Sequence, residues 1–346
     1  LAVIDIPKET EVLLETDLDV VGVGNAIVDV LAQVEESFIV ENGLEKGCMA
    51  LVDSERIADL RERMPAGLEV SGGSAANTIV GVTALGGRAS YIGKVANDDL
   101  GRIFRRDLAK AGVLFEATDG TGLPTGCCVI QVTPDAQRTL NTHLGISAHL
   151  SVEDIDPDVV SSAGILYCEG YLWDTHEAKM AIRYAMETAH RAGRTVALAL
   201  SDINCVDRHR TEWSSLLEEF VDVIFGNQEE VCSLYLSSDV EEALTMASTQ
   251  VDLVFATLGS RGSMVAQGTE RIEVSAAPVD QIVDTTGAGD MYASGVLLGI
   301  SRGMPIDQAA RLGSIAAAEI IRDLGARPGV DPYRSGGDWI VPYSAG

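Results

Sequence analysis

The sequence predicts an α/β protein in which a mainly parallel central sheet is flanked by helices, with a small β lid beside it. Apolar, strand-like runs alternate with segments of helical periodicity over most of the 346 residues. Two stretches, at about 31–52 and 113–142, interrupt this alternation with β-type patterns. We therefore expect one domain over residues 1–346, with a lid formed by these two insertions.

The alternation predicts the elements of the main sheet in chain order. Strands are expected at residues 20–24, 90–95, 165–168, 195–200, 221–225 and 253–257. Helices are expected at residues 74–85, 99–111, 176–192, 211–220 and 228–236, and mostly helix is expected from residue 287 onward. Such βα alternation is typical of a parallel sheet covered by helices on both faces.

The two interrupting stretches predict the lid. Within the second of them, residues 128–133 (CVIQVT) alternate in the manner of a strand, and Gly and Pro turns separate the runs. Neither stretch shows a helical pattern. We expect a lid that closes over a substrate and excludes water, and the alternative is a pair of ordinary surface hairpins. The tail at 328–346 is expected to be irregular.

Composition and charge exclude several classes of partner. The chain carries 25 basic and 52 acidic residues, a formal net charge of −27, which disfavours nucleic acid and anionic membrane surfaces. The apolar runs are much shorter than a membrane span. The five histidines lack metal-ligand spacing, so no metal site made of protein ligands is expected.

The cysteines and the N-terminus predict a cytoplasmic protein. None of the six cysteines has Cys-x-x-Cys spacing, and Cys127 and Cys128 are adjacent within an apolar run. They are interpreted as reduced core thiols, with metal or disulfide roles as the alternative. The chain begins with Leu1 and lacks the basic and apolar pattern of an export signal. Monomer and homodimer both remain open.

Residues 284–290 (DTTGAGD) carry the clearest chemistry in the chain. The backbone amides of Gly287, Ala288 and Gly289 at a helix start form a cradle for an anion, favoured by the helix dipole. The Asp290 carboxylate beside it can take a proton from a hydroxyl. Together these groups indicate phosphoryl transfer. The alternative is a strand-to-helix turn in which the glycines supply the bend and Asp290 complements the dipole.

With the preceding valine, this segment (VDTTGAGD) resembles the C-terminal signature of the ribokinase-like (PfkB) family of carbohydrate and nucleoside kinases. The resemblance implies a ribokinase-like fold. It implies that Asp290 is the catalytic base and that Gly287, Ala288 and Gly289 form the anion hole. It also implies ATP and Mg²⁺ as cofactors.

Two segments are candidates for the acceptor site. In the segment GNAIVD, after the first strand, Asn25 and Asp29 can hydrogen-bond a vicinal diol, and a polar loop with an Asx turn is the alternative. The segment SGGSAAN resembles the N-terminal signature of the family. That resemblance implies a hinge at Gly72 and Gly73 and an Asn77 that reaches the sugar. Paired glycines also permit backbone angles that other residues avoid.

Two further segments are candidates for the nucleotide end. Asn227 and Glu230 match the Asn-x-x-Glu motif of the family, which implies that Glu230 organises Mg²⁺ through water. The alternative is a helix that Asn227 caps. The segment TLGSRG resembles the nucleotide-binding loop of the family, which gives that role to Thr257, Gly259 and Gly262.

Three further roles complete the expected site. Arg138, on the second lid segment, can clamp the transferred phosphoryl group bidentately, and a solvated surface arginine is the alternative. The loop around Asp284 and Thr286 resembles the monovalent-cation site of the family, so K⁺ activation is considered. Tyr171, and as a second candidate Trp173, can stack on a base, and both are equally explained as core or rim residues.

The opening Gly-Asn-x-x-x-Asp, the Ser-Gly-Gly-Ser-x-x-Asn segment and an Arg-Thr-x-Asn segment resemble the adenosine kinase branch more than ribokinases or fructokinases. The resemblance implies a nucleoside acceptor held by Asn25, Asp29 and Asn77, and conversion of adenosine to AMP. The alternatives are a kinase for ribose, fructose or 2-keto-3-deoxygluconate, and a nucleoside- or sugar-binding protein without catalysis.

Overall fold

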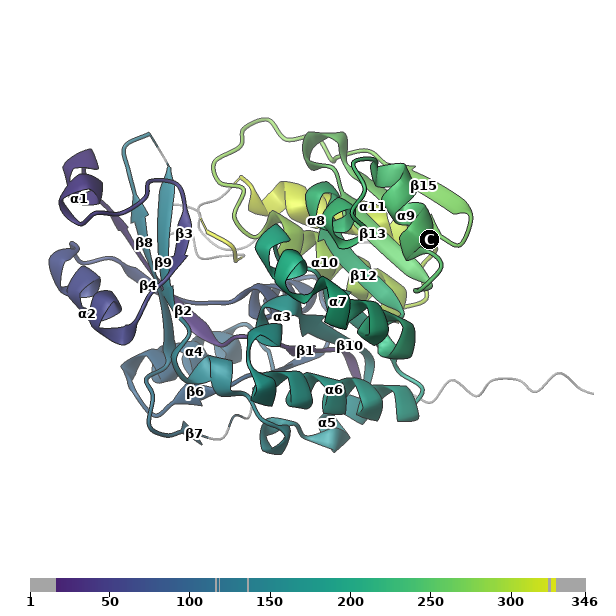
Figure 1. Cartoon of the computed structure of the whole chain (residues 1–346), viewed down its shortest axis with the longest axis horizontal. Coiled ribbons are helices and arrows are strands. Elements are labelled where there is room, and N and C mark those ends of the chain that lie inside the picture. Colours follow the sequence, from purple (N-terminus) through teal and green to yellow (C-terminus); the bar gives the residue numbers. More distant parts are fainter. Residues whose placement is uncertain (1–16, 116, 118, 136, 323–324, 328–346) are drawn as a thin grey trace, which may run out of the picture.

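The computed structural model describes residues 17–115, 117, 119–135, 137–322 and 325–327. Its centre is an eight-stranded sheet, at the right of Figure 1. In spatial order the strands are β15 (Glu270–Val274), β14 (Ser263–Gln267), β13 (Leu253–Thr257), β12 (Val223–Asn227), β11 (Thr195–Ala199), β10 (Ala163–Glu169), β1 (Leu18–Val23) and β5 (Ala89–Ile92). Neighbours from β5 to β13 pair in parallel, and β14 and β15 add an antiparallel edge.

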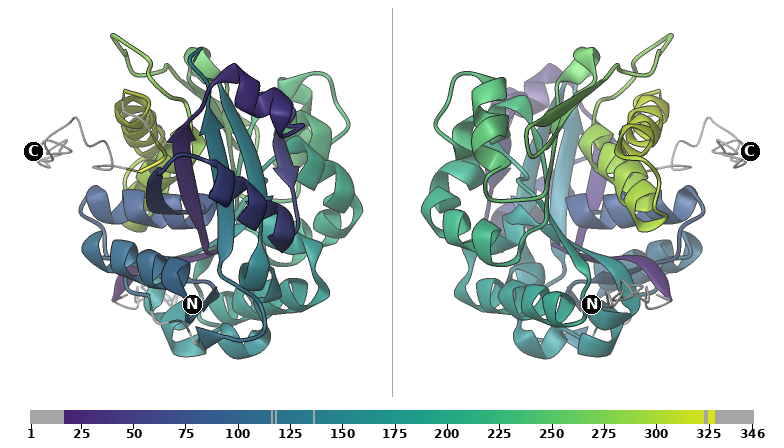
Figure 2. Two further views of the ribbon diagram at one scale, coloured as in Figure 1. Left: turned by 90° about the vertical axis from the view of Figure 1, so that its left-hand side faces the viewer. Right: turned by 90° about the vertical axis from the view of Figure 1, so that its right-hand side faces the viewer.

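Helices cover both faces of this sheet, as Figure 2 shows. One layer contains α3 (Ser74–Ala84), α10 (Ala288–Ser301) and α11 (Ile306–Ile320). The opposite layer contains α5 (Pro157–Ser162), α6 (His176–Arg191), α7 (Ile203–Phe220), α8 (Gln228–Leu234) and α9 (Val240–Ala247). Successive strand residues such as Ile165 and Leu166 enter opposite apolar clusters, because side chains alternate across a strand. This two-sided burial explains the continuous apolar runs in the sequence.

A second, smaller sheet lies beside the core, at the left of Figure 1. Its strands, in spatial order, are β3 (Met49–Leu51), β9 (Arg138–His143), β8 (Gly126–Val132), β2 (Ile27–Gln33) and β4 (Leu68–Gly72). The helices that accompany it are α1 (Glu36–Glu41), α2 (Ser54–Arg63) and α4 (Asp99–Lys110). One face of this small sheet packs against α2 and α4, and the other carries a separate apolar cluster around Leu31, Cys128 and Ile130.

Short elements complete the described chain. A two-stranded ladder joins β6 (Val95–Ala96) to β7 (Asp119–Gly120). Four 3₁₀ turns follow strands or loops: η1 (Gly145–His149), η2 (Val152–Asp154), η3 (Gly170–Asp174) and η4 (Gly259–Arg261).

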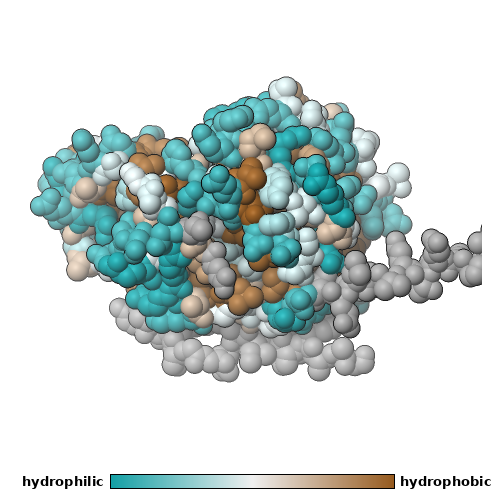
Figure 3. Space-filling view, turned by 90° about the horizontal axis from the view of Figure 1, so that it is seen from below, coloured by the Kyte–Doolittle hydropathy of each residue, from teal (hydrophilic) through white to brown (hydrophobic). Residues whose placement is uncertain are grey.

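Among the described residues no helix is long and apolar enough to cross a bilayer. All six cysteines are free thiols, and hydrophilic residues cover most of the face in Figure 3.

The predicted fold class is confirmed, and the structure corrects details of the small sheet. The sheet also uses β4 and the start of β2, which lie outside the two predicted insertions. The expectation of no helix within them was wrong, because residues 36–41 form α1. This helix has six residues and one buried side chain, Ile39, so it leaves no periodic signal in the sequence. The tail expected at 328–346 lies outside the described residues.

Helix α7 also begins earlier than predicted, at Ile203 and not near residue 211. Asp202 caps it by accepting a hydrogen bond from the Cys205 N–H. An N-terminal cap of this kind satisfies a backbone donor that the helix itself leaves unpaired.

Candidate active site

The anion cradle is a left-handed turn at the start of α10. Gly287 has φ of 77°, and a Cβ there would lie 2.7 Å from the Ala326 backbone, so this position requires glycine. The space around Gly289 is open. The Ala288 N–H donates to the Thr285 carbonyl at 3.2 Å, whereas no acceptor for the Gly287 and Gly289 N–H groups occurs within the described chain. Two of the three predicted amides therefore remain available to an anion.

Asp290 follows in the first turn of α10 and faces the start of α3. The Ser74 hydroxyl donates to Asp290 Oδ1 at 2.7 Å, and Asn77 Nδ2 donates to Asp290 Oδ2 at 3.0 Å. Burial raises the pKa of Asp290, and these two donors together with the charge of Arg327 lower it. The carboxylate is thus held in one orientation beside the cradle, as a proton acceptor requires.

Arg327 is a member of this site that the sequence did not indicate. Its guanidinium is buried, and Nε donates to Asn77 Oδ1 at 2.7 Å. Nη2 donates to the Gly72 carbonyl at 3.1 Å, and Nη1 donates to Ser71 Oγ. Burial lowers the pKa of Arg327 to about 10, so the group is charged at neutral pH. A single arginine after α11, outside any recognised motif, gave no signal in the sequence.

Asp29 lies on β2, across the site from Asp290. Its carboxylate accepts no hydrogen bond within the described residues, and its side chain lines a cavity. Burial raises its pKa to about 6, although Arg327 and Arg138 lower it. A Cβ at Gly72 would lie 2.5 Å from Asp29 Oδ2. Gly72 is therefore required for β4 to pass this close to the carboxylate.

The cavity, of about 1020 Å³, separates the apolar face of the small sheet from the loops before α10 and after α11. Its polar end contains Asp29, Asn77, Arg138, Thr286 and Arg327. Its apolar wall contains Leu31, Val70, Ile130 and Val132. Residues near its α1 end include Glu35, Phe38, Glu41 and Arg63. The cavity thus offers both polar and apolar surface to a ligand.

The structure corrects the expected role of Asn25. This side chain is buried, donates from Nδ2 to Glu169 Oε1 at 3.0 Å, and accepts from the Ser147 hydroxyl at 3.1 Å. It does not line the cavity. Glu169 also accepts from the Ala75 N–H at 2.9 Å, and burial raises the pKa of Glu169 to about 7. Asn25 therefore connects the end of β1 to Glu169 and Ser147, and both polar atoms of its amide already have partners inside the protein.

The aromatic candidates lie elsewhere as well. Tyr171 donates its hydroxyl to the Ser201 carbonyl at 3.3 Å, and Trp173 is buried and donates to Glu212 at 2.9 Å. Neither residue lines the cavity. Both belong to η3 at the end of β10 and pack in or against the apolar cluster there. The alternative interpretation, as core or rim residues at a strand end, therefore describes them better.

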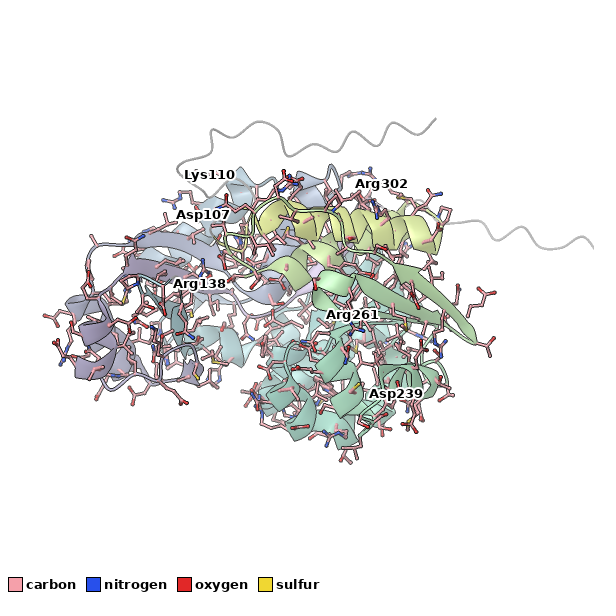
Figure 4. All side chains as sticks on the ribbon, turned by 90° about the horizontal axis from the view of Figure 1, so that it is seen from above. Asp107, Lys110, Arg138, Asp239, Arg261 and Arg302 are labelled. Carbon is pink, nitrogen blue, oxygen red and sulfur yellow. The ribbon has the colours of Figure 1, made fainter. Side chains whose placement is uncertain are left out.

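Arg138 joins the small sheet to the loop that precedes the cradle, at the position labelled in Figure 4. It forms an ion pair with Asp284 and donates to Thr286 Oγ1 at 3.0 Å. Asp284 also accepts from the Thr286 N–H and hydroxyl and from the Gly325 N–H. These donors occupy both carboxylate oxygens, so the residues do not fit the monovalent cation that the sequence suggested.

The expected nucleotide end is formed by two adjacent strand ends. Asn227 closes β12 and pairs in register with Thr257 at the end of β13. Asn227 and Glu230 form a reciprocal capping box, and burial raises the pKa of Glu230 to about 7. In the following turn Gly259 has φ of 61° with open space around it, and Gly262 has φ of 97°. Within the described residues no cluster of three His, Cys, Asp or Glu side chains forms a metal site.

Comparison with known proteins gives the family. Residues 49–332 match the model of the pfkB family carbohydrate kinases. The chain belongs to this family. The chain is therefore assigned to the kinases, which are phosphotransferases.

Both nucleoside and sugar kinases resemble this kinase. A structure of adenosine kinase from Sinorhizobium meliloti is 45% identical, with a TM-score of 0.84 over 90% of this chain and 96% of that one. A probable sugar kinase from Rhizobium etli is 42% identical, with a TM-score of 0.85 over 91% and 96%. The 5-dehydro-2-deoxygluconokinase of Geobacillus kaustophilus is 29% identical over 72% of this chain and 78% of that protein.

Proposed function

We propose that this kinase uses ATP to phosphorylate the 5′-hydroxyl of a nucleoside, converting adenosine to AMP. The observation that carries the proposal is the two-part cavity, in which an apolar wall from the small sheet faces a polar end near Asp290. A nucleoside has the same two parts, a flat base and a ribose. The 45% identity with the adenosine kinase of Sinorhizobium meliloti supports the same acceptor.

The apolar wall favours a nucleoside over a simple sugar. Leu31, Ile130 and Val132 present no side-chain polar atom to the cavity. A base can cover such a wall with its ring face, whereas sugar hydroxyls placed there would lose hydrogen bonds to water without replacement. At the polar end the Asp29 carboxylate, which accepts no hydrogen bond from the part of the chain that the structure describes, can accept from two ribose hydroxyls.

The proposed reaction uses groups that already lie together. Asp290 accepts the proton of the 5′-hydroxyl as the hydroxyl oxygen attacks the γ-phosphorus of ATP; the bond from that phosphorus to the β-phosphate oxygen breaks, and ADP leaves. The Gly287 and Gly289 amides, aided by the dipole of α10, stabilise the charge on the transferred phosphoryl group. Arg138, on the small sheet, places its guanidinium beside the loop that precedes these amides, where it pairs with Asp284. No step passes through a monovalent cation.

The nucleotide is assigned to the loop after β13 and the strand ends beside it. Gly259 leaves open space for phosphate or ribose, and Thr257 lies next to Asn227. When bound with ATP, Mg²⁺ would neutralise phosphate charge, and Glu230 is the carboxylate suited to hold it through water. Asn227 donates to both Glu230 oxygens, so a direct bond from Glu230 to the metal is not proposed. The small sheet is proposed to act as the lid.

A sugar-acid kinase is the second candidate. Arg63, Arg138 and Arg327 all line the cavity, and a carboxylate on the acceptor would find partners among them. The relatives that phosphorylate 5-dehydro-2-deoxygluconate agree with this alternative. The apolar wall is the feature that it leaves unexplained.

The test is coupled ADP release with ATP and Mg²⁺ across adenosine, inosine, guanosine, ribose, fructose and 2-keto-3-deoxygluconate. The proposal predicts that adenosine has the highest kcat/KM. It also predicts that Ile130→Thr raises the KM for adenosine roughly tenfold, because a hydroxyl is placed against the base. Ile203→Thr, on the exposed start of α7, is the matched control. Turnover confined to a sugar or sugar acid would reject the nucleoside.

A further inference from the structure

The guanidinium of Arg327 contacts both parts of the molecule. Nη1 and Nη2 donate to Ser71 and Gly72, which end strand β4 of the small sheet. Nε donates to Asn77 on α3 of the core. Asn77 then donates to Asp290. One buried side chain thus connects the corner of the small sheet to the carboxylate that accepts the proton.

Arg327 also determines which end of the Asn77 amide meets Asp290. An arginine has five N–H donors and no acceptor, so only the Asn77 carbonyl oxygen can face it. The Asn77 amide nitrogen must then face Asp290, at 3.0 Å from Oδ2. With the amide reversed, its carbonyl oxygen would face the carboxylate and repel it. Asp290 and Arg327 therefore favour the same orientation of the Asn77 amide, and Arg327 fixes it through the carbonyl oxygen while Asp290 accepts from the nitrogen.

Arg327 supplies a positive charge among the carboxyl groups that surround Asp290. From β10 the site is faced by Glu169 and by the Tyr167 hydroxyl, and from β2 by Asp29. On α3 the facing groups are the uncharged donors Ser74 and Asn77. Arg327 is the cation that lowers the pKa of Asp290 against burial. Its loss would leave the carboxylate among two other carboxyl groups.

We infer that Arg327 is a positioning residue: it holds the Asn77 amide in the orientation that donates to Asp290, and thereby keeps the Asp290 carboxylate aligned. The inference rests on the proposed role of Asp290 as the base. Since the same guanidinium binds Ser71 and Gly72, the alignment also depends on the position of the β4–α3 corner.

The kinetic test compares pH profiles of kcat/KM for adenosine. Arg327→Met keeps the length of the side chain and removes its charge and donors, and Arg327→Lys restores the charge alone. Arg322→Met, at the end of α11 in a pair with Glu319, is the matched control. In Arg327→Met the acidic limb is expected to move up by about one pH unit, because the pKa of Asp290 rises. In Arg327→Lys the movement is smaller, and the control keeps the wild-type profile.

A second readout does not need turnover. Carboxyl ¹³C resonances of aspartate-labelled protein are titrated, and the Asp290 signal is assigned by its absence in Asp290→Asn. An upward movement of the Asp290 titration in Arg327→Met supports the inference, even if Asp290→Asn proves active and the proposed base fails. An unchanged titration, or lower activity with an unchanged pH profile, overturns it. If Arg327→Met does not fold, Arg327→Gln removes the charge, keeps donors, and is expected to show the same direction.

Discussion

Replacing Asp29 by asparagine is expected to stabilise the ligand-free protein and to weaken binding of the acceptor. In the structure the Asp29 carboxylate accepts no hydrogen bond within the described residues, so the substitution removes no internal hydrogen bond, and the attraction of Arg327 and Arg138 only partly offsets the cost of burial. Burial raises the pKa of Asp29 from the ordinary 3.8 to about 6. The folded protein therefore spends free energy on keeping this group ionised, which is useful only when hydroxyls bind to it.

The magnitude follows from the change in pKa. A rise from 3.8 to about 6, at 1.36 kcal/mol for each pKa unit, corresponds to about 3 kcal/mol. Because the folded-state pKa is raised, this cost is absent below pH 3.8, where both states are protonated. It reaches its full value above about pH 6. Asp29→Asn should therefore be more stable than wild type by about 3 kcal/mol at pH 8, with an advantage that shrinks as the pH falls.

The assay is urea-induced unfolding at pH 8, 6.5 and 5, without ligand. Asp280→Asn, at an exposed position that makes the same change of charge, is the control. The KM for the acceptor is measured alongside, and it should rise about 10- to 100-fold because two charged hydrogen bonds are weakened. An Asp29→Asn protein that is less stable than wild type at pH 8, or a stability difference that does not vary with pH, would show that burial of the Asp29 charge does not destabilise the folded protein.

Three other outcomes are expected. Arg138→Ala should lower kcat by about tenfold or more and affect acceptor affinity less, because the Asp284 pair beside the cradle is lost; steady-state kinetics showing an effect on affinity alone would place Arg138 elsewhere. Gly73→Ala should destabilise the protein by about 1–3 kcal/mol, since φ is 93° and the new Cβ would meet the Asn25 carbonyl at 2.2 Å; an unchanged melting temperature would contradict this. Tyr171→Phe should leave the acceptor KM within about twofold, and a large rise would return Tyr171 to the acceptor site.

Much of the main fold was predictable because its strands are buried on both faces. Strand β13 was predicted with the bounds that the structure shows, and α3 with a difference of one residue. The small sheet was harder to predict. Its strand β3 has three exposed residues, and α1 has only one buried residue, so neither leaves the periodic pattern on which sequence interpretation depends.

The residues of the candidate site also differ in how well the sequence predicts them. Asp290 and the cradle glycines are contiguous in sequence, so their chemistry was visible before the structure. Arg327 acts through contacts with residues about 250 positions away, and its neighbours in sequence give no hint of them. Asn25 shows the opposite error, a ligand contact that was predicted from the sequence but is not observed. Its amide follows a strand end, where ligands often bind, but in the structure it donates to Glu169. Contacts of long sequence separation limit what one sequence can predict.

Base catalysis by Asp290 is tested by comparing wild type with Asp290→Asn for adenosine binding and for ATP-dependent formation of AMP. We expect a kcat at least about 100-fold lower in Asp290→Asn, because general base catalysis is lost, and an adenosine Kd close to that of wild type. An Asp290→Asn protein that forms AMP at the wild-type rate would contradict this expectation, and so would a wild type that binds adenosine without phosphorylating it.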